Sequence, residues 1–325
     1  MSIRNRRSTA AVLTAGVAAL LALSGAAATA MAVPSPGRDA RSSAAMVAAS
    51  ASAHTLSVPR GLTISDGTRH VWVNGKSVDF GTVVRDLAWN PRGTKAAFID
   101  GHGNLEVSDP DGSHRRTVAA NPGGQTWSHP TWQVTAADRA NGIPAKNNLI
   151  FSAKVHGSTV LERVKATADH GTPARISLNS DADGGGLPKT DNTWPNVGGT
   201  YGTSVYENTR TGEVYIRDDY LRQQGGALTR GSEPALAPDA EEVVFVRSIG
   251  GHDHLFVDDL STGSNAVKDI TPHATTDYTE PTWSPDGKTI AFRAPTGTYT
   301  VTRTAHGFGK PVKVTRHTGL PAYRG

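Results

Sequence analysis

The chain has 325 residues, a formal charge of +4 at pH 7 and no cysteine. The lack of cysteine excludes disulfide bonds, thiolate metal sites, a catalytic cysteine and lipid attachment through an N-terminal cysteine. Three arginines near the N-terminus account for most of the excess charge, which leaves a formal +1 for residues 33–325. Since the sequence has no long Lys/Arg run and no aromatic-rich platform for single strands, we expect no nucleic-acid partner.

Residues 1–32 have the layout of a secretory signal peptide. Arg4, Arg6 and Arg7 give a positive start, an apolar run covers residues 10–23, and small residues at 28–32 offer cleavage sites. The apolar run is short for a membrane span of about 20 residues, which favours cleavage over a retained anchor. We therefore expect a secreted or extracytoplasmic protein without stable membrane insertion.

Residues 33–60 are predicted to form a flexible linker, because this Ala/Ser/Pro-rich segment has too little bulky apolar content to fold. The folded domain is expected to span residues 61–325. It begins with three short predicted strands at 62–64, 70–73 and 77–80, which are separated by glycine-containing turns.

The most regular motif in the chain covers residues 278–292. A short apolar strand ends at Trp283, the sequence Ser-Pro-Asp-Gly at 284–287 forms a tight turn, and residues 288–292 return as a second strand. Proline presets φ at the second turn position, and glycine tolerates a positive φ. The motif therefore predicts a β-hairpin.

Copies of this hairpin recur at blade-sized intervals. Two good copies cover residues 86–98 and 233–245, and two eroded copies begin at His129 and Trp194. The equivalent apolar positions lie at intervals of 43, 65, 39 and 47 residues, and are Trp89, Trp132, Val197, Leu236 and Trp283. Periods of about 40–50 residues made of strands indicate a β-propeller. We expect the three tryptophans to pack in the core between adjacent blades.

The last repeat has no blade behind it. Residues 320–323 read as one more innermost strand, and the three strands at 62–80 lack such a strand. If the C-terminal strand completes the N-terminal blade, every strand is used and the ring closes without exposed sheet edges. The sequence thus predicts an all-β fold, a six-bladed β-propeller whose N- and C-terminal strands share one blade.

The pattern Glu-Pro-x-Trp-Ser-Pro-Asp-Gly-Lys-x-Ile-Ala-Phe at 280–292 resembles the repeat of TolB-like six-bladed propellers. The resemblance covers about residues 61–325. It implies the fold and a periplasmic protein that binds envelope proteins, although similar repeats also occur beside peptidase domains and in some sugar-cleaving enzymes. Because a shared architecture does not fix what its surface binds, the function must come from the site.

Motifs for catalysis and for metal binding are weak. The sequence has no Gly-x-Ser-x-Gly and no His-Glu-x-x-His, which removes the commonest hydrolase and zinc protease motifs. His252 and His254 are fewer ligands than a zinc site needs. Residues 179–184 resemble half of a calcium loop, but Thr190 stands where a bidentate glutamate is required. We expect no catalytic residue, no metal and no cofactor.

The candidate binding site comes from alignment of the repeats. The residue three positions before each equivalent apolar position is expected to lie at one mouth of the central channel, and these residues, named here the mouth ring, are Asp86, His129, Trp194, Glu233, Glu280 and Leu320. Three acids and a histidine suit a cation, a basic peptide or sugar hydroxyls, and Trp194 offers an aromatic surface. The alternative is structural, with carboxylates accepting hydrogen bonds from backbone N–H groups of the next blade.

These observations lead to a functional hypothesis with an alternative. We expect a monomeric, non-enzymatic propeller that binds a protein or a cell-envelope glycan through one face of the ring. The alternative is a carbohydrate-active lyase or hydrolase, which needs the mouth carboxylates to converge on an open pocket. The insertions at 134–147 and 181–192 are either further binding loops or tolerated surface variation.

Overall fold

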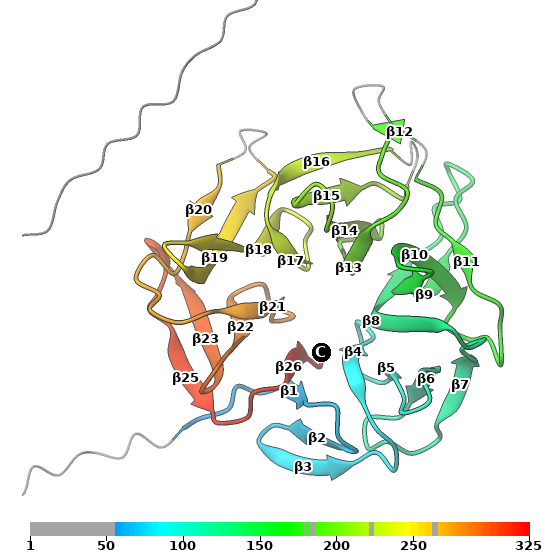
Figure 1. Ribbon diagram of the computed structural model, residues 1–325, viewed down its shortest axis with the longest axis horizontal. Coiled ribbons are helices and arrows are strands. Elements are labelled where there is room, and N and C mark those ends of the chain that lie inside the picture. The colour runs from blue at the N-terminus through cyan, green and yellow to red at the C-terminus, as the bar shows by residue number, and fades with distance from the viewer. Residues whose placement is uncertain (1–55, 179, 182–185, 221–223, 262–265) are drawn as a thin grey trace, which may run out of the picture. The chain divides into compact units, whose positions relative to one another are not determined.

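The computed structural model describes residues 56–178, 180–181, 186–220, 224–261 and 266–325. Within these residues the strands form six sheets, which are arranged in a ring (Figure 1). The predicted six-bladed β-propeller is thereby confirmed. None of the described residues lies in a helix long and apolar enough to cross a membrane. The predicted signal peptide and most of the predicted linker lie outside the described residues.

Each blade is an antiparallel sheet whose first strand faces the channel. The first blade contains β26 (Leu320–Tyr323), β1 (Leu62–Ser65), β2 (His70–Val73) and β3 (Lys76–Asp79). The second contains β4 (Arg85–Trp89), β5 (Ala96–Ile99), β6 (Leu105–Ser108) and β7 (Arg116–Ala119). The third contains β8 (Gln125–Thr135), β9 (Lys146–Val155), β10 (Ser158–Lys165) and β11 (Ala174–Arg175). The fourth contains β13 (Asn192–Gly198), β14 (Thr203–Asn208), β15 (Glu213–Arg217) and β16 (Gln224–Arg230), with β12 (Ser180–Asp181) parallel beside β16. The fifth contains β17 (Ser232–Leu236), β18 (Glu242–Ile249), β19 (His252–Asp259) and β20 (Lys268–Asp269). The sixth contains β21 (Thr279–Trp283), β22 (Thr289–Ala294), β23 (Gly297–Thr304), β24 (Gly307–Phe308) and β25 (Val312–Thr315), and both β24 and β25 pair with β23.

The ring closes through the chain ends, as predicted. Strand β26 pairs antiparallel with β1 in a register that runs from Leu62 opposite Tyr323 to Ser65 opposite Leu320. The red C-terminal strand therefore lies beside the blue β1 as the innermost strand of the first blade (Figure 1). This pairing gives β1 a partner on each side and removes an exposed edge from the sheet.

The Ser-Pro-Asp-Gly turn explains why the hairpin motif recurs. The Ser284 hydroxyl donates to Asp286 Oδ1 at 2.6 Å and accepts from the Thr289 backbone N–H at 2.9 Å. The Gly287 N–H donates to the Ser284 carbonyl at 2.9 Å, and its φ of 67° is one that favours glycine. These hydrogen bonds are all within the turn, so its conformation does not depend on contacts with the next blade.

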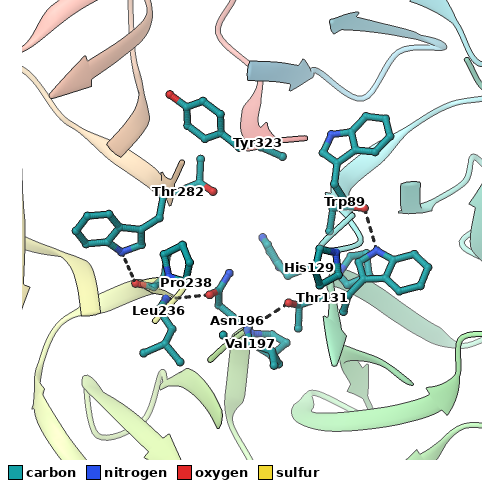
Figure 2. A pocket seen from close by; sticks show the side chains of 18 of the residues that line it. Trp89, His129, Thr131, Asn196, Val197, Leu236, Pro238, Thr282 and Tyr323 are labelled. Carbon is teal, nitrogen blue, oxygen red and sulfur yellow. Dashed lines mark hydrogen bonds between the residues drawn. The ribbon is translucent and has the colours of Figure 1, made fainter. Parts of the chain in front are cut away.

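The tryptophans of the repeat join adjacent blades. Trp89, Trp132 and Trp283 are buried, with exposed fractions of 8%, 7% and 6%. The indole Nε1 of Trp132 donates to the Ala88 carbonyl at 3.1 Å, and that of Trp283 donates to the Ala235 carbonyl at 3.1 Å (Figure 2). In both pairs the accepting residue comes directly before the equivalent apolar residue of the previous blade in the sequence.

The other junctions between blades also have a hydrogen bond at this position of the repeat, but the donor or the acceptor is a different chemical group. The Trp89 indole donates to Thr63 Oγ1 at 2.9 Å, and this hydroxyl donates to the Ala322 carbonyl at 2.9 Å. The backbone N–H of Val197 donates to Thr131 Oγ1 at 3.3 Å, and that of Leu236 donates to Asn196 Oδ1 at 2.9 Å (Figure 2). Blades that lack a tryptophan at the equivalent apolar position thus use a polar side chain of the previous blade as the acceptor.

Replacing Trp283 tests this junction. Trp283→Ala should lower the free energy of unfolding by about 3–5 kcal/mol, because the side chain loses its burial and leaves a cavity. Trp283→Phe keeps a buried ring but leaves the Ala235 carbonyl without its donor, so its cost should be nearer 1–3 kcal/mol. Urea unfolding followed by circular dichroism measures both. Unchanged stability of the alanine variant would contradict the placement of Trp283.

Candidate functional site

Five members of the mouth ring share an unusual backbone conformation. Their φ angles are 55°, 51°, 54°, 51° and 55° at Asp86, His129, Trp194, Glu233 and Glu280, respectively. In each case the pairing register shifts at this point of the innermost strand, as in a β-bulge. A left-handed φ at a residue other than glycine costs about 1–2 kcal/mol, so surrounding contacts must hold it.

Hydrogen bonds between blades supply those contacts. The His129 N–H donates to Asp86 Oδ2 at 3.0 Å, and the Glu280 N–H donates to Glu233 Oε2 at 2.6 Å. The Trp194 N–H donates to the hydroxyl of Ser152 in β9 at 3.1 Å. Because equivalent positions bond to one another, the innermost strands run in the same direction and the mouth ring lies at one end of the channel.

The central channel is a cavity of about 470 Å³ that all six innermost strands line. Asp86, His129, Trp194 and Leu320 line it, together with inward-facing residues such as Thr131. Figure 2 shows His129 beside this space. Glu233 and Glu280 are not among its lining residues. The structure therefore divides the predicted site into a part on the cavity and a pair of glutamates behind its wall.

The part on the cavity combines an aromatic stack with a carboxylate. The rings of His129 and Trp194 lie 3.8 Å apart between centroids, at an angle of 35°. Burial lowers the pKa of His129, although the Asp86 carboxylate opposes this shift. Its Nδ1 is buried and has no hydrogen-bond partner among the described residues. A neutral imidazole, an indole face and a carboxylate can together hold a ligand with both polar and apolar groups.

The glutamate pair lies against β14 and β22. Glu280 Oε1 accepts from Arg293 Nη2 at 2.8 Å, and Glu207 Oε2 accepts from the Glu233 N–H at 3.2 Å. Burial raises the pKa of Glu280 to about 7, while Arg293 opposes the shift and the carboxylates of Glu233 and Asp86 add to it. Burial also raises the pKa of Glu233 and of Glu207. Ionisation of the carboxyl groups in this glutamate cluster is therefore less favourable than it would be in water.

The other candidate ligands do not come together. His254 Nδ1 lies 2.9 Å from Asp269 Oδ2, whereas His252 Nδ1 lies 3.4 Å from Asp277 Oδ1, so the two histidines face different carboxylates. In the part of the chain that the structure describes, no group of three or more His, Cys, Asp or Glu side chains is placed to hold a metal ion. Residues 179 and 182–184 of the calcium-loop resemblance lie outside the described residues.

The two insertions have different environments. Residues 134–147 extend the hairpin of the third blade, and their loop lines a second pocket together with Tyr201 and Tyr220 of the fourth blade. In the other insertion Leu187 is buried against the core between the third and fourth blades. The sequence indicates the first insertion but neither tyrosine, because neither lies in a repeat motif and the pocket forms only when two blades meet.

The described strands thus form a six-bladed β-propeller, and part of the mouth ring lines its central cavity. No protein-family model matches the chain, and no curated protein matches its sequence.

Solved structures share the fold at low sequence identity. TolB from Acinetobacter baumannii is 14% identical with a TM-score of 0.56, and the match covers 81% of this chain but only 65%, less than two thirds, of that one. A putative TolB from Agrobacterium tumefaciens is 19% identical with a TM-score of 0.56, covering 79% of this chain and 89% of that one. A chain of a nidogen/laminin complex is 9% identical with a TM-score of 0.56, covering 81% and 97%, respectively. At these identities the comparisons show the fold.

Glu280 makes stability depend on pH. Its pKa is raised from 4.5 to about 7, so its ionised form is less favourable in the folded than in the unfolded protein. The stability that this group contributes is present below about pH 4.5 and is lost as the pH rises through about 7. A shift of this size corresponds to about 2–4 kcal/mol.

Glu280→Gln should therefore become more stable relative to the parent as the pH rises from 5 to 8. Urea unfolding at both pH values measures the difference, with Glu241→Gln as the control because Glu241 is exposed. An unchanged stability difference between the parent and Glu280→Gln across this range would contradict the raised pKa.

Proposed function

We propose that this protein is an extracytoplasmic, non-enzymatic propeller that binds a protein or a cell-envelope component at the mouth of its channel. The observation that carries the proposal is the set of Asp86, His129 and Trp194 on a cavity of about 470 Å³. An aromatic face beside a few polar groups in a preformed cavity is typical of a binding site. The signal peptide predicted at residues 1–32 supports the location.

The orientation of the acidic side chains favours binding over catalysis. Glycoside cleavage needs two carboxyl groups that flank a bond in one open pocket. Here Asp86 and Glu233 each accept a backbone N–H from the next blade, and Glu233 and Glu280 lie off the cavity. One of the similar chains, from the nidogen/laminin complex, also belongs to an assembly of proteins.

A carbohydrate-active enzyme is the second candidate, and one observation favours it. Glu280 has a pKa of about 7, and its buried Oε2 has no hydrogen-bond partner among the described residues. A carboxyl group that keeps its proton near neutral pH can serve as a general acid. This role requires a substrate to reach Glu280 from the channel.

Affinity capture with two matched variants tests the proposal. The full chain, with a tag inserted in the predicted linker, is expressed in the producing cell, and envelope components are recovered with it. Asp86→Asn with Trp194→Ala removes groups from the cavity, while the asparagine retains an acceptor for the His129 N–H. Glu233→Gln with Glu280→Gln changes only the pair behind the wall. Both variants must first unfold as cooperatively as the parent.

The mouth variant is expected to lose the captured partner, and the glutamine pair is expected to retain it. A control with Asp66→Ala, Asp169→Ala and Glu241→Ala removes three exposed acids that do not line the cavity and should also retain it. Equal capture by the mouth variant and the parent would contradict the proposal. Release of shortened glycans that the glutamine pair abolishes would establish the enzyme instead.

A further inference from the structure

A second pocket lies between the third and fourth blades, at the channel end opposite the mouth ring. Its walls come from the loop that follows β8, the turn that follows β13, and Tyr220, which follows β15. The first two segments follow the C-terminal ends of innermost strands, whereas the mouth ring lies near their N-terminal ends. The pocket, named here the tyrosine pocket, has a volume of about 450 Å³.

Hydrogen bonds hold one wall of the tyrosine pocket in place. The Tyr220 hydroxyl donates to Asp138 Oδ2, and Asn141 Nδ2 donates to the same oxygen at 2.7 Å. The ring of Tyr220 packs against that of Tyr201, with centroids 4.2 Å apart and an angle of 33°. Tyr201 is nevertheless 53% exposed. The two tyrosines therefore form an aromatic surface that hydrogen bonds to Asp138 hold in place and that is exposed to solvent at Tyr201.

A buried ionic network joins the pocket to the blades. Lys146 Nζ lies 2.8 Å from Asp219 Oδ2, and Arg217 Nη1 lies 2.9 Å from Asp219 Oδ1. Gln133 Nε2 also donates to Asp219 Oδ2, at 2.7 Å. Lys146 lines the pocket, and its side chain is 15% exposed. The network therefore holds Lys146 in the pocket wall with its charge paired to Asp219.

The charges around the pocket are unequal. Of the residues on its lining, Lys146 and Arg139 are positively charged and Asp138 is negatively charged. Asp138 is occupied by its bonds to the tyrosine wall, and Lys146 by its pairing with Asp219 in the buried network. The exposed groups that can meet a ligand are thus the Arg139 guanidinium and the ring of Tyr201, with Thr135 and Thr200 also on the pocket lining.

We propose that the tyrosine pocket binds an acidic sugar residue of a glycan. The sugar ring stacks on the exposed face of Tyr201, and its carboxylate interacts with Arg139. A volume of about 450 Å³ suits a ligand of this size. Threonine hydroxyls pair well with sugar hydroxyls, and a flat tyrosine face suits a sugar ring better than it suits an acidic peptide. This site goes beyond the channel-mouth function and does not depend on it.

Titration calorimetry with defined probes tests the proposal. The probes are a tetrasaccharide that contains glucuronic acid, a neutral glucose tetrasaccharide and a tetraglutamate peptide. The full chain should bind the acidic tetrasaccharide, and Tyr201→Ala should weaken this binding at least tenfold. Arg139→Gln should weaken it about threefold and make its salt dependence smaller. Ile249→Ala removes an exposed apolar side chain on the fifth blade and should change nothing.

Three outcomes would overturn the site. These are no binding of the acidic tetrasaccharide at millimolar concentration, equal binding by Tyr201→Ala, or binding of tetraglutamate without the saccharide. The Asp86→Asn with Trp194→Ala variant should bind the saccharide as the parent does. Failure at the channel mouth and failure at the tyrosine pocket are therefore distinguishable.

Discussion

The rest of the structure depends on one left-handed residue in each of five innermost strands. At these positions the strand bulges, and in four of them the backbone N–H donates to an acceptor on the preceding blade. The strain of about 1–2 kcal/mol per residue is offset by hydrogen bonds that would be lost if the blades separated. Ring closure by β26 and β1 keeps the blades together, so the bulges and the closure stabilise each other.

The members of the mouth ring with this left-handed conformation differ in whether they line the cavity. Where the acceptor is Asp86, that residue lines the cavity beside the His129 and Trp194 stack, whereas Glu233 and Glu280 do not line it and the Glu233 N–H donates to Glu207. The same position in the repeat therefore lines the cavity in four blades and belongs to a buried acidic cluster in the other two. The structural and binding roles of these residues are compatible.

Much of the fold was predictable because its determinants are local. Ser284, Asp286 and Gly287 fix a turn through bonds within six residues, and the motif recurs where the hairpin recurs. The bulge was not predictable, because Glu233 and Trp194 carry no signal for a positive φ, which only the neighbouring blade imposes. The direction of the Glu280 side chain depends on Arg293 in another strand, and the tyrosine pocket requires two blades. The aligned repeats thus located the mouth ring but not which side chains reach the cavity.

The most direct test of binding at the channel mouth is photo-crosslinking in the producing cell. A photoreactive phenylalanine analogue replaces Trp194 on the cavity in one variant and the exposed Val312 on an outer strand in another. The account predicts a defined adduct from position 194 that position 312 does not give. An adduct from position 312 alone, or none from position 194 while the partner is still captured, would contradict it.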